Sequence, residues 1–364
     1  FFDDLKIRSS FGYTGNQEIG NYNSLPRLVT NLTYIFNNQL FSGSRQSSLA
    51  NLDLTWEKSG QWDIGLDVAF WDSRMRLVFD YYRKNTQDLL FTINLPAYSG
   101  FSTALFNTGS LLNKGFEIEL DFDILSGNVT WSAQANYSRN KTAMTSLGRS
   151  GATNLFIGYP PGVGLAYVFD GVFRNQGEID QQTAQVGVVP GDYKYKDIDG
   201  NGEFNANDRI LVGKPIPDYI FGLNNHVSYK GFTFMVFLQG SIGRDGNRIS
   251  TLMNPSSSVS NKARILVNRW TPESPDTDIP RAGATNFMTS TYLRQDLSFV
   301  RLKNVQLGYR IPLGNSRTFR DAYIYLSGQN LLTFTDKDFF GFDPDAGDGY
   351  PLAKTMMAGL NIGF

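Results

Sequence analysis

The chain alternates hydrophobic and polar residues with a period of two over many short segments, which is the pattern of β-strands with one apolar and one polar face. The clearest case is the segment 61–82, which predicts two strands joined by a turn at Trp71-Asp72-Ser73. Large apolar side chains occupy every second position from Trp62 to Phe70 and from Met75 to Tyr81. The other face of this hairpin carries Asp63, Asp67, Arg76 and Asp80.

The same pattern recurs along the chain and predicts about ten strands. It appears in hairpins at Gly115–Asn140 and Asp218–Gly243, and in a last strand that ends at Phe364. Short turns and long loops alternate along the chain, so a meander would place all short turns at one end of the sheet. This asymmetry is typical of an up-and-down transmembrane barrel and is not required in a soluble sandwich. We therefore predict an all-β, antiparallel, transmembrane β-barrel wall.

The barrel prediction gives each part of the chain an environment. Short turns are periplasmic, and the long loops, above all residues 145–217 and 244–297, are extracellular. In the hairpin at 61–82 the large apolar residues face lipid, whereas Asp63, Asp67, Arg76 and Asp80 line the lumen. Aromatic residues beside the short turns, such as Trp71, match the aromatic belts of membrane interfaces.

Composition restricts the function. Aromatic residues make up 14% of the chain and there are 36 glycines, which favours a β-protein. The net charge of -1 gives no excess of positive charge that would indicate nucleic-acid binding. The absence of cysteine excludes disulfides and thiol catalysis, and a single histidine, His226, excludes a multi-histidine zinc site. We expect no enzyme activity and place His226 in the lumen. Three alternating carboxylates are interpreted as lumen-lining rather than as a glycosidase pair: Glu117, Glu119 and Asp121.

Several stretches carry a family resemblance, in family order and over nearly the whole chain. They include NKGFEIEL, GDYKYKDIDGNGEFNANDR, RWTPESPDTDIPR, VRLKNVQLGYRIP, GFDPD and the terminal phenylalanine. The chain resembles the C-terminal part of SusC/RagA-type TonB-dependent outer-membrane transporters. The resemblance implies that the chain supplies about ten C-terminal strands of a barrel of about 22 strands that encloses a plug. It also implies import of an oligomeric nutrient, an oligosaccharide first and a peptide second, across the outer membrane of a Gram-negative bacterium.

The resemblance also implies partners. These are a SusD-type surface lipoprotein over the barrel mouth, TonB through an N-terminal part, the remaining half of the barrel with its plug, and a bilayer that contains lipopolysaccharide. An open sheet of about ten strands would leave two unpaired edges in lipid, at several kcal/mol for each unsatisfied backbone group. We therefore expect the chain to be a fragment or one of two chains that complete one barrel.

One motif predicts site chemistry. Residues 197–208 match the twelve-residue calcium loop D-x-[DN]-x-[DN]-G at its first, third, fifth and sixth positions. Aspartate replaces the usual glutamate at the twelfth position, which would weaken the site, and no helices are expected on either side. The predicted ion is structural Ca²⁺, with Mg²⁺ second, and the alternative is a solvated turn. The predicted ligands are Asp197, Asp199, Asn201, Glu203 through its carbonyl, Asn205 and Asp208.

Two questions stay open at this level. Aromatic residues of the long loops could stack on a sugar or pack the loops together: Tyr159, Tyr167, Tyr193, Trp270 and Tyr292. Two other functions also fit the pattern. One is a secreted calcium-binding β-domain that binds glycans without transport, and the other is a passive or secretion-associated outer-membrane barrel.

Overall fold

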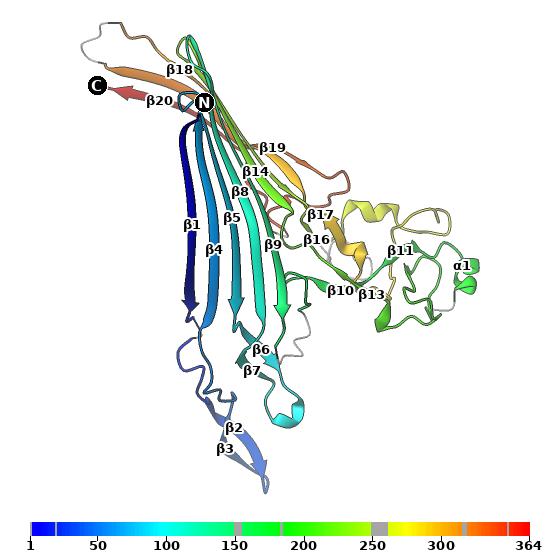
Figure 1. The fold of residues 1–364 in the computed structure, drawn as a ribbon. Helices are drawn as coiled ribbons and strands as arrows, with labels where there is room; N and C mark the ends of the chain where they lie inside the picture. Colours follow the sequence, from blue (N-terminus) through cyan, green and yellow to red (C-terminus); the bar gives the residue numbers. More distant parts are fainter. Residues whose placement is uncertain are drawn as a thin grey trace. The chain divides into compact units, whose positions relative to one another are not determined.

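The computed structural model describes residues 2–18, 20–148, 155–182, 185–248, 261–314, 319–347 and 349–364. Ten long strands form one antiparallel sheet in the order β1-β4-β5-β8-β9-β14-β15-β18-β19-β20 (Figure 1). Each strand of this sheet lies beside the next long strand in the sequence, which confirms the predicted meander of about ten strands. The strands are β1 (Phe2–Asn16), β4 (Glu57–Phe70), β5 (Met75–Gln87), β8 (Ser110–Leu125), β9 (Val129–Ser146), β14 (Tyr219–Tyr229), β15 (Phe232–Ile242), β18 (Phe299–Arg310), β19 (Asp321–Thr335) and β20 (Thr355–Gly363).

The chain divides into two compact units. Unit 1 comprises Phe1–Phe122 and Ala135–Pro161, and unit 2 comprises Asp123–Gln134 and Gly162–Phe364. The alternation of short and long connections is present in both units. In the described residues no helix is long and apolar enough to cross a membrane.

The short turn of unit 1 is at the predicted place. Trp71, Asp72 and Ser73 all have left-handed φ values, between 56° and 59°, and the amide of Arg74 donates to the carbonyl of Trp71. The left-handed residues reverse the chain between β4 and β5 at the end where β1 starts (Figure 1). Aromatic rings collect at this end, with 5.1 Å between the ring centres of Phe2 and Phe70.

Two hairpins in the loops of unit 1 were not predicted. They are β2 (Leu28–Phe36) with β3 (Gln39–Gln46), and β6 (Leu90–Asn94) with β7 (Thr103–Asn107). The first turns at Asn37 and Asn38, whose φ values of 48° and 59° are those of a type I′ turn. This Asn-Asn pair between two apolar runs is the sequence signal that could have revealed the hairpin.

The two faces of the unit 1 sheet are as the alternation predicts. On one face Ile64 lies opposite Tyr81, and Phe79, Phe116 and Tyr137 form a chain of ring contacts across three strands. On the other face Arg8 forms ion pairs with Asp67 and Asp80 at 2.8 and 2.9 Å. Asp63 on this polar face accepts a hydrogen bond from Ser10, and Arg76 lies opposite Asp121. The assignment of these faces to lipid and lumen stays a prediction.

Unit 2 contains most of the long loop predicted at 145–217 and the loop predicted at 244–297, and the described parts of both are structured. They contain strand pairs β10 (Gly164–Tyr167) with β13 (Arg209–Val212), β11 (Phe169–Val172) with β12 (Tyr193–Tyr195), β16 (Asp245–Asn247) with β17 (Arg294–Asp296), and helix α1 (Gln176–Gln181). The turn between β18 and β19 lies partly outside the described residues.

A buried aromatic core joins the described parts of these two loops. Tyr193 is fully buried and Tyr292 is 7% exposed, and both belong to a cluster with Tyr195, Ala284 and Leu293. The rings of Tyr193 and Tyr195 are parallel, with 6.1 Å between their centres. Tyr193 and Tyr292 therefore pack the two loops together. Neither ring is available to stack on a sugar, because both are buried.

Candidate functional site

The predicted calcium loop folds around three carboxylates of unit 2. Single oxygens from Asp197, Asp199 and Asp208 all lie within 4.8 Å of one another. Asp208 is fully buried, Asp197 is half-buried and Asp199 is exposed. None of the three forms an ion pair with a described residue. Negative charges at this spacing repel one another unless hydrogen-bond donors or a cation offset them.

Backbone amides hold the loop in a tight turn. Asp197 accepts hydrogen bonds from the amides of Gly200 and Gly202 at 2.7 and 2.8 Å. Gly202 occupies the sixth position of the motif with a φ of 78°, which is why glycine is favoured there. The amide of Glu203 donates to the side chain of Asn201 at 2.7 Å. These contacts hold Asp197 and Asn201 within one tight turn.

Asp208 closes the loop. Its two oxygens accept from the amides of Ile198 and Asn205 at 2.9 and 2.8 Å. Burial alone would raise the pKa of this carboxyl, but the donating amides, first that of Asn205, outweigh burial and hold the pKa below its ordinary value. Asp208 is therefore an ionised, buried carboxylate.

The remaining predicted ligands have local partners in the loop. Asn205 accepts a hydrogen bond from the amide of Asn207 and forms a capping box with Asp208 on a short 3-10 helix, Ala206–Asp208. The sequence did not predict this helical turn. In this helical turn Asn205 acts as the helix cap, whereas the sequence predicted it as a direct or water-mediated metal ligand. The turn also brings Asp208, the shorter residue at position twelve, to the cluster.

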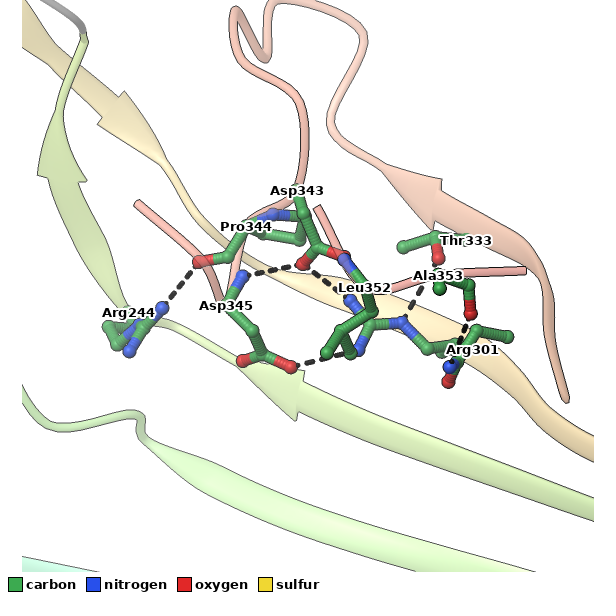
Figure 2. Close-up of polar contacts among 9 residues, drawn as sticks. Arg244, Arg301, Thr333, Asp343, Pro344, Asp345, Leu352 and Ala353 are labelled. Carbon is green, nitrogen blue, oxygen red and sulfur yellow. Dashed lines mark hydrogen bonds and ion pairs between the residues drawn. The ribbon is translucent and has the colours of Figure 1, made fainter. Parts of the chain in front are cut away.

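A second cluster in unit 2 was missed by the sequence analysis. Arg301 on β18 is fully buried and donates to Asp343 at 2.6 Å and to Asp345 at 3.0 Å (Figure 2). Thr333 on β19 accepts a third hydrogen bond from the same guanidinium, which lies 4.7 Å from the ring centre of Phe299. Both aspartates belong to the stretch GFDPD between β19 and β20. We call Arg301, Asp343 and Asp345 the arginine latch.

The arginine latch fixes the loop at 336–354 to the strands. Asp343 also accepts from the amides of Asp345 and Leu352, at 2.9 and 3.4 Å. The carbonyl of Pro344 accepts from Arg244, the first residue of the earlier long loop at 244–297 (Figure 2). Each oxygen of Asp343 therefore has a partner, as a buried carboxylate requires. GFDPD was noticed only as part of a resemblance, because its arginine partner is about forty residues away.

Two further groups are on the faces that parity predicts. His226 lies opposite Met235 on the polar face of β14 and β15, with Ser228 at 3.4 Å. Glu117 lies opposite Asp80 on the polar face of β5 and β8.

Comparison with known proteins decides the family. The sequence profile described as "TonB dependent receptor-like, beta-barrel" matches residues 1–331. The chain belongs to the TonB-dependent receptor family. Its relatives include the TonB-dependent receptor P3 of Formosa agariphila, at 37% identity over 99% of this chain and 39% of that protein. TonB-dependent receptor SusC of Bacteroides thetaiotaomicron is 28% identical over 99% of the chain and 38% of that protein.

Solved structures agree with the family. The RagAB peptide transporter superposes with a TM-score of 0.82 at 27% identity, over 99% of this chain and 41% of that one. The RagAB peptide importer in its open-open state gives the same score. The fold is thus that of part of a TonB-dependent receptor barrel, a β-barrel of the Gram-negative outer membrane. The chain spans about two fifths of the length of the relatives it matches.

Proposed function

We propose that this chain forms part of the wall and of the outward loops of an importer that takes up an oligomeric nutrient using TonB. A SusD-type lipoprotein would cover the loop end, and a plug and the other strands would complete the barrel. The supporting observation is the match to the RagAB peptide transporter over 99% of the chain, together with a sheet that has one apolar and one polar face.

The polar face of unit 1 narrows the substrate class. The strand registers place eight carboxylates and four cations on this face across β1, β4, β5 and β8. A wall with this excess of negative charge disfavours polyanionic oligomers and tolerates neutral or cationic ones. A neutral oligosaccharide is the first candidate, and the RagAB neighbours make a peptide the second. The carboxylates are Asp4, Glu57, Asp63, Asp67, Asp80, Glu117, Glu119 and Asp121, and the cations are Lys6, Arg8, Arg76 and Lys84.

Uptake by whole cells tests the function. Cells that carry the full-length gene and a gene for a SusD-type lipoprotein are given labelled neutral oligosaccharides, sulfated oligosaccharides or mixed peptides. We expect uptake of one neutral or cationic class, and loss of uptake without TonB. Uptake that persists without TonB would favour a passive barrel, and binding without uptake would favour a glycan-binding domain.

We also propose that the loop at 197–208 binds Ca²⁺ and that the ion stiffens the loop without taking part in catalysis. The proposal is supported by the three carboxylate oxygens within 4.8 Å and by the burial of Asp208 without a cationic partner. Oxygen donors with this negative charge are suited to Ca²⁺. We expect an affinity like that of extracellular calcium-binding modules, with a Kd of roughly 10⁻⁴ to 10⁻³ M. Mg²⁺ is the second candidate.

Calorimetric titration of the full-length protein with Ca²⁺ tests this site. We expect one site in the wild type and none in Asp197→Asn/Asp199→Asn. The matched control is Asp276→Asn, which removes an exposed loop carboxylate of unit 2 that pairs with Arg174. Equal binding by wild type and the double variant at millimolar Ca²⁺ would remove the proposal.

A further inference from the structure

An irregularity in β18 decides which way Arg301 faces. Lower on the strand, Gln306 lies opposite Met235 on the polar face of β15. Arg301 lies opposite Gln239, which is on the same face as Met235 because side chains alternate along β15. Arg301 and Gln306 are five positions apart, so an uninterrupted strand would place them on opposite faces. The register shift beside Leu302 corrects this and turns Arg301 to the polar face.

The two faces at this end of the sheet differ in exposure. Arg301 and Phe299, its neighbour on the polar face of β18, are 0% and 2% exposed. On β19, Leu332 and Phe334 alternate with the polar-face partner of Arg301, and these two apolar-face residues are 51% and 62% exposed. The polar face is therefore covered here, whereas the apolar face is bare. The cover includes the loop at 336–354, which supplies both carboxylates around Arg301 (Figure 2).

Further hydrogen bonds hold the loop at 336–354 on this face. Near its start, the amide of Phe340 donates to the side chain of Gln295 on β17 at 2.8 Å. Near its end, the carbonyl of Ala353 accepts from Asn330 at 3.0 Å. Asn330 has a left-handed φ of 52° and lies at the matching irregularity of β19. With the arginine latch between them, these bonds fix the loop near its start, its middle and its end.

The fixed loop carries large exposed side chains. Phe342 is 68% exposed and Tyr350 is 98% exposed. Phe342 directly precedes Asp343, so the arginine latch also restricts the main chain that carries this ring. A loop that is tied to the wall at several points cannot move aside as a free loop can. Bulky groups on it therefore reduce the open space beside the polar face permanently.

We propose that the loop at 336–354 is a fixed constriction of the lumen, that it limits the width of the oligomer that passes, and that Arg301 is its positioning residue. The proposal rests on the proposed function, which places the polar face of the sheet in the lumen. Selectivity in a pore depends on its diameter and on the groups that line it. A constriction pinned by a buried ion pair keeps one width. It therefore passes an unbranched oligomer and rejects a branched one of the same chemistry.

Uptake of substrates of graded width tests the constriction. Cells that carry the full-length gene are given the neutral oligosaccharide or peptide that they take up, either unbranched or with a bulky neutral side group at mid-chain. The variants are Arg301→Gln and Arg301→Lys, which keeps the charge but loses the planar fork of the guanidinium. The matched control is Arg310→Gln, which removes an arginine of the same strand that pairs with Asp321 and not with the loop.

Two further measurements keep the test decisive. Heat-modifiable migration confirms that each variant is folded, and Asp345→Asn, which removes the more exposed partner of Arg301, replaces Arg301→Gln if that variant does not assemble. This chain has no cysteine, so single cysteines can be placed in a full-length protein without others. Phe342→Cys and Leu326→Cys are treated on intact cells with a membrane-impermeant maleimide. Leu326 is 61% exposed on the apolar face in the middle of β19.

We expect the wild type to take up the unbranched substrate and to reject most of the branched one. Arg301→Gln should raise the ratio of branched to unbranched uptake severalfold, Arg301→Lys should give an intermediate ratio, and Arg310→Gln should match the wild type. Phe342→Cys should react with the maleimide and Leu326→Cys should not.

The outcomes separate the constriction from transport. Equal uptake of both substrates by the wild type, or an unchanged ratio in folded Arg301→Gln, would overturn the constriction and leave the transport proposal standing. Reaction of Leu326→Cys, or no reaction of Phe342→Cys, would overturn both, because the faces of the sheet would then be wrongly assigned.

Discussion

Unit 2 has two loops rich in aspartate, and they solve the same electrostatic problem in different ways. In the arginine latch a buried guanidinium pairs with Asp343 and Asp345. In the loop at 197–208 three aspartates converge and no described cation joins them. Burial of a carboxylate is costly unless it is paired or hydrogen-bonded. The latch therefore contains its own counter-charge, whereas the other loop depends on backbone amides and, as we propose, on an ion from solution.

The two loops meet the same aromatic core. Phe204, in the proposed calcium loop, stacks on Tyr195 with 5.6 Å between ring centres. Phe340, just before GFDPD, also packs against the buried cluster. One loop is thus fixed to this core by its own ion pair, and the other, as we propose, is fixed in a way that depends on Ca²⁺ in solution. The comparison makes four predictions, which follow in order of decreasing effect.

Loss of the arginine of the latch should have the largest effect. Arg301→Gln leaves two carboxylates near the strands with no cation, and breaking a buried ion pair typically costs about 3 to 5 kcal/mol. We expect the amides of Asp345 and Leu352, which donate to Asp343, to lose protection from hydrogen exchange in the full-length protein. Unchanged protection would mean that the latch does not hold the loop. The double variant Arg301→Gln/Asp343→Asn should recover part of the loss.

Alkaline titration tests whether the shared core stays buried. Burial raises the pKa of Tyr195 and of Tyr292 to about 12. In the unfolded chain these phenols ionise near pH 10, so their contribution to stability is complete below about pH 10 and is lost as the pH rises to about 12, at roughly 2 kcal/mol each. Absorbance near 295 nm should show tyrosines that ionise late, and Tyr195→Phe should remove one. Ionisation of all tyrosines near pH 10 would contradict this.

Calcium removal should have a smaller effect that is confined to one loop. At about 2 mM Ca²⁺ and the Kd expected here, binding stabilises the loop by roughly 1 to 2 kcal/mol. A chelator should therefore increase hydrogen exchange at Gly200 and Gly202, whose amides donate to Asp197, and leave Asp345 unchanged. An equal response at both loops would remove the distinction between them.

The sequence predicted the wall of the sheet better than its loops, for a physical reason. Strand parity is set by neighbouring residues, so Trp62 to Phe70 and the turn at Trp71 could be placed from their alternation. The calcium loop is also local, since Asp197 and Asp208 lie within one short stretch. The arginine latch joins residues about forty positions apart, and the aromatic core joins Tyr193 to Tyr292, about a hundred positions apart. No period or spacing links such residues before the chain is folded.

The smallest effect is expected at Arg310, which is on the same strand as Arg301 and forms an ion pair of the same type. Arg310 lies 3.4 Å from Asp321, but its side chain is 72% exposed and that of Asp321 is 47% exposed. Exposed ion pairs contribute about 0 to 1 kcal/mol because water screens both charges. Arg310→Gln should therefore leave the thermal unfolding temperature of the full-length protein nearly unchanged, whereas Arg301→Gln should lower that temperature clearly. If both variants lose the same stability, burial is not what distinguishes the latch, and the contrast between the two aspartate loops would have to rest on hydrogen bonding alone.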